Sequence, residues 1–282
     1  MFSDKISNSS SEEVNGSLIE FELIGQGLER YTINLELLYP NTQDRIRFEQ
    51  RWPGFYNSDS VNADIMRKNG DDLVYISESI VPIVESNKPP LLFVFGNPAP
   101  HSVKAGIPFA YEGNGKEHRI WKVLKSTSLI DFGLDHSELN PNDMNLHRKN
   151  RLHNLEYNSK YKIGFIQYFS MPSTPSKIPW TGVSGLSRLF GNDAMRLIEA
   201  TELNRIKAIV DSFMANGGVI VTFQKDAYNG LKSEQMFNYS IDLAKANMLS
   251  GESMFGKDYK LICAPPTRLL YSKAMFNTLS NL

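Results

Sequence analysis

The sequence predicts an α/β protein: a three-layer α/β/α sandwich around a central, mostly parallel four-stranded sheet, with an N-terminal extension. Short apolar runs bounded by proline, glycine or polar residues are typical of strands that are buried on both faces. The clearest helix pattern, Asn192–Asn216, lies between two of these runs and ends at a pair of glycines. Because strands and crossover segments alternate along the chain, we expect the strands to run parallel.

The predicted elements follow from these patterns in chain order. The strands are expected at Leu91–Phe95, Tyr161–Phe169, Val219–Phe223 and Lys260–Cys263. Helices are expected to begin near His118, to span Asn192–Asn216 with Leu203, Ile206, Val210 and Phe213 on one face, and to end the chain at Leu269–Leu279.

The N-terminal third does not follow this alternation. Residues 1–17 are polar and predict a disordered tail, 18–85 an extension packed on the core, and 86–282 the main domain. Alternating residues between Ser17 and Pro40 indicate a hairpin or two short strands, whereas Asn41–Gly70 carries no clear pattern. Leu73, Ile76 and Ile80 recur at helical spacing, so we expect a helix at Asp71–Val81.

Composition excludes several classes of protein. The chain has 282 residues, of which 41% are hydrophobic and 22% charged, and none of its apolar runs approaches the roughly 18 residues of a membrane span. The polar N-terminus is unlike a signal peptide, so we expect a cytoplasmic protein that has no membrane partner. Cys263 is the only cysteine, which excludes an intrachain disulfide framework and a zinc or iron–sulfur site built from cysteines.

Charge is distributed unevenly along the chain. Residues 1–90 hold 8 Lys/Arg and 15 Asp/Glu, a balance of −7, which leaves 22 basic and 16 acidic residues and a balance of +6 in residues 91–282. The larger part is thus mildly basic and permits an anionic partner. The densest basic run, His147–Arg151, is expected in a solvated loop.

Motif searches leave the loop after Leu91–Phe95 as the main candidate site. No P-loop or dinucleotide fingerprint, no G-x-S-x-G elbow and no paired histidines at metal-ligand spacing occur, so no cofactor and no metal are expected. The loop itself presents Asn97, His101 and Ser102 where a parallel strand delivers its carboxyl end, the edge at which α/β sheets bind ligands.

Several segments resemble, in the same order, the motifs of one family. They are Asn97–Phe109, with Asn-Pro at its start and Pro-Phe at its end; His118-Arg119-Ile120-Trp121; Gly164–Pro172; Gln224-Lys225-Asp226-Ala227-Tyr228; and Ala264-Pro265-Pro266. This set resembles the uracil-DNA glycosylase superfamily, and within it the mismatch-specific uracil/thymine-DNA glycosylases, over about Leu91–Leu279. The resemblance does not extend to residues 1–85.

The resemblance implies a monofunctional DNA glycosylase that hydrolyses the N-glycosidic bond of uracil, or of a related damaged base, flipped out of DNA. It implies that Asn97 positions the attacking water, that Phe109 stacks on the base, and that Gly96, Pro98 and Gln167 contact the base. His101, Ser102, Lys225, Arg268 and Leu269 are expected to contact DNA. The expected partner is uracil-containing or mismatched DNA, and the expected state is a monomer.

The last of these segments departs from the family pattern and leaves alternatives open. The family often has His or Asn followed by Pro-Ser there, but this chain has Ala264 and Pro266, and Ala264 has no side-chain donor for a developing anion. One alternative is therefore a catalytically weak or inactive protein that binds nucleic acid or a protein partner. Another is an α/β enzyme that acts on a free nucleoside, which an acidic N-terminal region covering the groove would favour.

Overall fold

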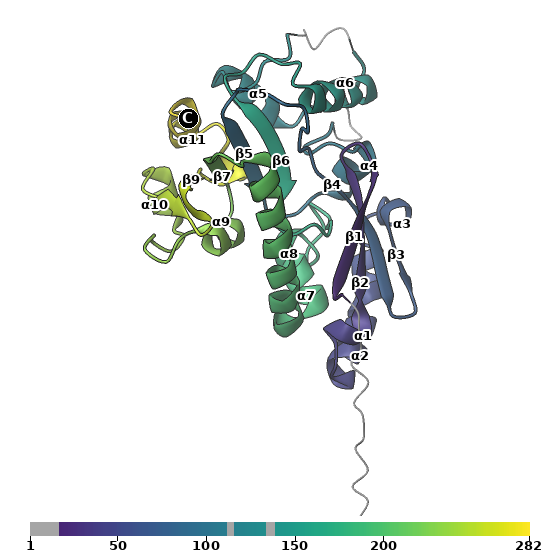
Figure 1. Ribbon diagram of the computed structural model, residues 1–282. Helices are drawn as coiled ribbons and strands as arrows, with labels where there is room; N and C mark the ends of the chain where they lie inside the picture. Colours follow the sequence, from purple (N-terminus) through teal and green to yellow (C-terminus); the bar gives the residue numbers. More distant parts are fainter. Residues whose placement is uncertain (1–16, 112–115, 134–138) are drawn as a thin grey trace, which may run out of the picture.

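Two β-sheets organise the computed structural model, which describes residues 17–111, 116–133 and 139–282 (Figure 1). One is a five-stranded sheet in the order β6-β5-β7-β9-β8, and the other is a four-stranded sheet in the order β1-β2-β4-β3. The predicted tail at 1–17 lies almost wholly outside the described residues. The α/β class is confirmed.

The larger sheet is mostly parallel, but it has five strands rather than the predicted four. Its strands are β5 (Pro90–Phe95), β6 (Lys162–Gln167), β7 (Gly218–Thr222), β8 (Ser250–Ser253) and β9 (Gly256–Cys263). The first three and β9 are the four predicted strands, and they pair in parallel. The additional strand β8 forms an antiparallel hairpin with β9 at the sheet edge. It is short and polar, so it lacks the apolar run of a central strand.

Helices cover both faces of this sheet, because alternate residues of its strands enter two separate apolar clusters. Leu92, Val94 and Ile166 pack with α7 (Gly182–Phe190), α8 (Asn192–Phe213) and α9 (Lys225–Leu231). Leu91, Phe93 and Phe165 pack with α5 (Arg119–Ser126), α6 (Pro141–Asn154) and α11 (Lys273–Ser280). The strands are therefore buried on both sides, as their continuous apolar runs predict.

The smaller sheet is antiparallel and occupies the N-terminal part of the chain. Its strands are β1 (Ile19–Gly25), β2 (Leu28–Asn34), β3 (Met66–Asn69) and β4 (Asp72–Glu78). The antiparallel pair β1–β2 confirms the hairpin or pair of short strands expected between Ser17 and Pro40. β2 ends at Asn34, whose side chain caps the short helix α1 (Leu35–Leu38), and helices α2 (Thr42–Tyr56) and α3 (Asn62–Ile65) lead to β3.

The prediction of a helix at Asp71–Val81 is wrong, because most of this segment forms strand β4. Leu73, Tyr75 and Ser77 are buried at a period of two, and a glycine turn at Gly70 joins the strand to β3. The helical spacing of Leu73, Ile76 and Ile80 is coincidental, because Ile80 lies beyond the strand and bridges to Phe165 of the larger sheet. Strand pairing on both sides outweighs the local pattern.

The basic run at His147–Arg151 belongs to helix α6 and not to a solvated loop. Asn140 caps the helix, and Arg148 is only 2% exposed because it pairs with Glu117 and lies over the ring of Trp121. Buried ionic and aromatic partners thus turn part of a polar sequence inward.

The remaining segments lie near the carboxyl edge of the larger sheet. Helix α4 (Pro100–Ala105) follows β5, α10 (Ile241–Lys245) precedes β8, and the 3-10 helix η1 (Thr267–Leu269) follows β9. The predicted final helix is therefore divided, with η1 at its start and α11 as its main part. The best predicted helix, α8, begins at Asn192 as expected and ends at Phe213, three residues before the predicted end at Asn216.

Candidate functional site

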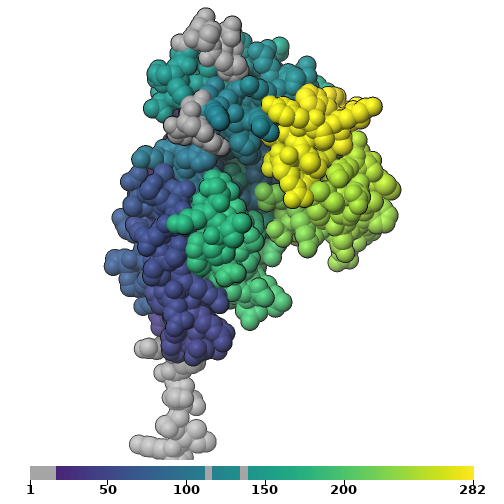
Figure 2. All heavy atoms as spheres, turned by 180° about the vertical axis from the view of Figure 1, so that it is seen from behind, coloured from purple at the N-terminus to yellow at the C-terminus, as the bar shows by residue number. Residues whose placement is uncertain are grey.

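A cavity of about 200 Å³ lies at the carboxyl edge of the larger sheet. Its lining comes from the ends of β4, β5 and β6, from α4 and the start of α5, and from the segments that follow β5, β6, β7 and β9. The lining residues are Glu78, Phe95, Gly96, Asn97, Pro98, Ala99, His101, Ser102, Phe109, His118, Gln167, Pro175, Gln224 and Thr267. Figure 2 shows the blue and green parts of the chain facing the yellow C-terminal part on one side of the molecule. The sheet edge predicted to carry the site therefore does carry a cavity.

Asn97 enters this cavity with its amide held in one orientation. Its Nδ2 donates to the carbonyl oxygen of Met171 at 3.2 Å and to Ser173 Oγ at 2.8 Å. A carbonyl oxygen can only accept, so the amide nitrogen must face Met171 and the Oδ1 atom must point away from it. Oδ1 is therefore available as an acceptor for a water molecule or a ligand.

The main chain around Asn97 is fixed by the strand beside it. The oxygens of Phe95 and Gly96 accept from the amides of Tyr168 and Phe169, each at 2.8 Å, and the Pro98 oxygen accepts from the Ser173 amide at 3.1 Å. The loops after β5 and β6 thus continue the pairing of their strands into the site.

Gly96 is closely approached by the end of the side chain of Gln224, a cavity residue that the sequence prediction did not include. A methyl group at Gly96 would lie 1.8 Å from Gln224 Oε1. Gln224 is the second residue after β7, and a polar residue just beyond a buried parallel strand was an available signal for it.

Phe109 is half-buried and held from several sides. Its φ of 55° lies in the left-handed region, and its carbonyl oxygen accepts from Trp121 Nε1 at 2.9 Å. Its ring stacks on His118, with centroids 4.5 Å apart, and meets Phe95 edge to face. The aromatic surface that Phe109 offers to the cavity is thus built together with His118, which the sequence prediction assigned only to a helix start.

Gln167 is 4% exposed and lies at the end of β6. Its Nε2 donates to Glu78 Oε1 at 3.2 Å, and its Oε1 has no hydrogen-bond partner in the described part of the chain. Glu78 is another residue of the site that the sequence prediction missed, because it lies in the segment predicted as a helix. Burial raises the pKa of its carboxyl group well above the usual range, although the bond from Gln167 opposes the shift.

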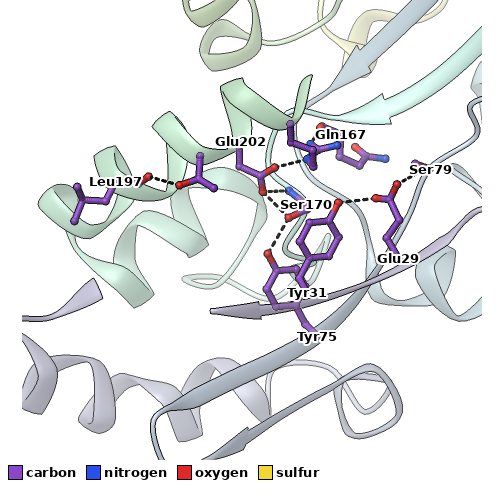
Figure 3. Close-up of polar contacts among 10 residues, drawn as sticks. Glu29, Tyr31, Tyr75, Ser79, Gln167, Ser170, Leu197 and Glu202 are labelled. Atoms are coloured by element: carbon purple, nitrogen blue, oxygen red, sulfur yellow. Dashed lines mark hydrogen bonds and ion pairs between the residues drawn. The ribbon is translucent and has the colours of Figure 1, made fainter. Parts of the chain in front are cut away.

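A buried polar network holds the main chain near Gln167 (Figure 3). Arg205 of α8 donates to Glu202 Oε2 at 2.6 Å and to the Gln167 carbonyl oxygen at 2.5 Å. Glu202 Oε1 accepts from the amide and hydroxyl of Ser170, and this hydroxyl lies 2.8 Å from the hydroxyl oxygen of Tyr75 on β4. The network connects both sheets and fixes the end of β6.

The loop after β9 contributes a different residue from the expected one. Ala264 is fully buried in the apolar cluster beneath α5 and α11, with its amide paired to the Thr222 oxygen at 2.8 Å. Thr267 is the residue of this loop that lines the cavity. Ala264 itself is not part of the lining that the described residues form.

The residues predicted to contact DNA divide into two groups. His101 and Ser102 of α4 line the cavity. Lys225, Arg268 and Leu269 lie outside the lining that the described residues form, but each follows a lining residue closely along the chain. Lys225 and Arg268 are exposed, whereas Leu269 is half-buried.

The described ranges contain no group of three His, Cys, Asp or Glu side chains placed to hold a metal ion. Over the same residues, no helix is both long enough and apolar enough to cross a membrane.

No protein-family model matches the chain, and no curated protein matches its sequence.

Proposed function

We propose that the chain is a monofunctional DNA glycosylase that releases uracil, or a related damaged base, from DNA. The observation that carries the proposal is Asn97, whose amide nitrogen is bound by Met171 and Ser173 so that its oxygen is left for a water molecule. The residues selected by resemblance for the base and for water, Gly96, Asn97, Pro98, Phe109 and Gln167, all line the same cavity.

The cavity has the features that a flipped base requires. An unstacked base regains stacking energy on an aromatic surface, which Phe109 and His118 can supply. Its edge needs polar groups that are already fixed, and Gln167 is held through its main chain by Arg205. The rim needs cations for phosphates, and Lys225 and Arg268 are exposed on segments that border the cavity.

The chemistry assigned to Asn97 is orientation of the nucleophile. An amide oxygen accepts a hydrogen bond from water but takes up no proton near neutral pH, so it aligns the attack on C1′ without acting as a strong base. We therefore expect slow base release, for which the sugar must develop most of its positive charge before water attacks.

Base release from uracil-containing oligonucleotides tests the proposal. Single-stranded, U:A and G:U substrates are incubated with the protein, and abasic sites are cleaved with alkali. Asn97→Ala is expected to lower the single-turnover rate by about 10²-fold or more, by analogy with the loss of a fixed polar group at a reacting centre. Asn150→Ala, which changes an exposed asparagine in the middle of α6, is the matched control and should retain the wild-type rate.

Other outcomes would contradict the proposal. Equal rates for wild type and Asn97→Ala would remove Asn97 from the mechanism. Salt-dependent DNA binding without base release would favour the alternative, a non-catalytic nucleic-acid-binding protein, which the burial of Ala264 away from the cavity supports. Failure to bind DNA at all would favour an enzyme acting on a free nucleoside.

A further inference from the structure

Glu78 is a buried carboxyl group that the N-terminal sheet contributes to the cavity. It ends β4, is 1% exposed and lines the cavity together with Gln167. Its Oε1 accepts from Gln167 Nε2 at 3.2 Å, while its Oε2 is buried and has no hydrogen-bond partner among the described residues. An unpaired buried carboxyl oxygen is costly unless a ligand completes its hydrogen bonding.

The surroundings of Glu78 favour the neutral acid. A buried carboxylate is stable only beside a cation or several donors, and among the described residues Glu78 has only neutral donors, its own main-chain amide and the side-chain amide of Gln167. The titratable and charged groups around it are Glu29 of β2, His101 of α4, His118 at the start of α5, and Arg205 of α8, which is bound to the main chain of Gln167. Burial and the charge of Glu29 both raise the Glu78 pKa.

Protonation decides which oxygen of Glu78 can donate. Oε1 already accepts the amide hydrogen of Gln167, so the proton belongs on Oε2. The Oε2 hydroxyl is then a donor without an acceptor among the described residues, and the unpaired Oε1 of Gln167 is an acceptor on the neighbouring side chain. The pair therefore matches a ligand edge on which a carbonyl oxygen and an N–H group are adjacent.

We propose that Glu78, as a neutral carboxylic acid, donates a hydrogen bond to a carbonyl oxygen of the extruded base and so restricts the substrates to bases that carry an oxo group. This inference rests on the proposed glycosylase function. Glu78, at the end of β4, then supplies the hydrogen-bond donor that the side chain of Ala264 cannot supply. A carboxylic acid kept neutral in an apolar site is a known means of stabilising such a developing oxyanion.

Base release breaks one bond at C1′ and forms another. The C1′–N bond breaks, and its electron pair moves to the base, where the charge spreads onto the carbonyl oxygen that faces Glu78. A C1′–O bond forms to the water molecule aligned by Asn97. The proton lost by that water ends on the released base, so Glu78 keeps its own proton and acts only as a hydrogen-bond donor.

Two substitutions at the same position separate donation from packing. Glu78→Met keeps the length of the side chain but has no donor, and it is expected to lower the single-turnover rate of uracil release by about 10²–10³-fold. Glu78→Gln has a neutral amide donor and should stay within about tenfold of wild type, because a neutral donor replaces most of the interaction. Thermal unfolding of both variants checks that they are folded.

A second carboxylate on the same sheet provides the matched control. Glu29 accepts from Tyr31 at 2.5 Å and from Ser79 at 3.0 Å, so both of its oxygens are already paired, and it does not line the cavity. Glu29→Gln should leave base release at neutral pH unchanged, because burial, and not the charge of Glu29, is the main cause of the raised Glu78 pKa. A loss of rate in this variant equal to that of Glu78→Met would indicate a general structural effect and would overturn the assignment to Glu78.

The pH profile distinguishes a donor from a merely structural side chain. The raised pKa of Glu78 favours its protonated form, so the wild-type rate should fall toward alkaline pH as the carboxyl ionises. Glu78→Gln cannot ionise and should lack this alkaline loss. Identical profiles for the two proteins would overturn the inference.

Failure of this inference and failure of the proposed function give different results. If wild type releases uracil and Asn97→Ala does not, but Glu78→Met matches wild type, only the role of Glu78 is wrong. If wild type releases no base from any of the substrates, both proposals are wrong.

Discussion

The two sheets both supply polar groups to the cavity, but they differ in how they expose them. The parallel sheet supplies Asn97 from a loop at its carboxyl edge, where the side chain is half-buried and its amide nitrogen is fully bonded. The antiparallel sheet supplies Glu78 from the end of a strand, where it is buried and one of its oxygens is unpaired. An edge loop thus gives a group that water can reach, whereas the second sheet gives a desolvated group.

The difference indicates that the two sheets supply side chains with different chemical roles. Orienting a water molecule requires contact with solvent, but an electrostatic donor is more effective in surroundings from which water is excluded. The two sheets must then keep a fixed position relative to each other. A network of hydrogen bonds connects them and consists of Glu202, Arg205, Ser170 and Tyr75.

The largest effect is expected where this connection is broken. Arg205→Met should lower the free energy of unfolding by about 3–5 kcal/mol, because the buried carboxylate of Glu202 loses its only ion pair among the described residues. Urea unfolding measures the loss. The double variant Glu202→Gln/Arg205→Met removes both charges and keeps an acceptor for Ser170, so it should recover much of the stability. Equal losses in the single and double variants would show that charge burial is not the cause.

A smaller effect is expected at the loop after β9. Ala264→His introduces the residue common in the family, but position 264 is fully buried, so overpacking should cost about 1–3 kcal/mol. Base release should not increase, since position 264 is not part of the lining that the described residues form, whereas Thr267 is. Thermal unfolding and uracil release are the measurements. A more active Ala264→His protein would contradict the assignment of the donor to the antiparallel sheet.

The smallest effect on stability is expected at the edge of the parallel sheet. Gly96→Ala forces the end of the flexible Gln224 side chain to move, so the free energy of unfolding should change by less than about 1 kcal/mol. Uracil release should nevertheless fall, because Gln224 then occupies a different part of the cavity. Gly25→Ala, whose added methyl group meets nothing within 4 Å, is the matched control. Unchanged release by Gly96→Ala would show that Gln224 has no part in the site.

Prediction from sequence succeeded where a run of consecutive apolar residues indicates a buried strand. The strand at Leu91–Phe95 is apolar at every position because helices cover both faces of its sheet, and the loop that follows it carries Asn97 to the cavity. It failed at β4 because Leu73, Ile76 and Ile80 imitate helical spacing, and the partners that make the segment a strand lie far away in the sequence or beyond a turn.

The α/β class, the parallel strands and the position of Asn97 follow from the sequence alone, since each of these depends on short-range patterns of apolar residues and chain breakers. The burial of Glu78 in the cavity, and of Ala264 outside its lining, follows from the tertiary packing. Desolvation depends on what packs around a residue in space. Glu78, which lies in a segment predicted as a helix of the N-terminal extension, is therefore a cavity residue. Ala264, which lies in a motif expected to form the site, is a core residue.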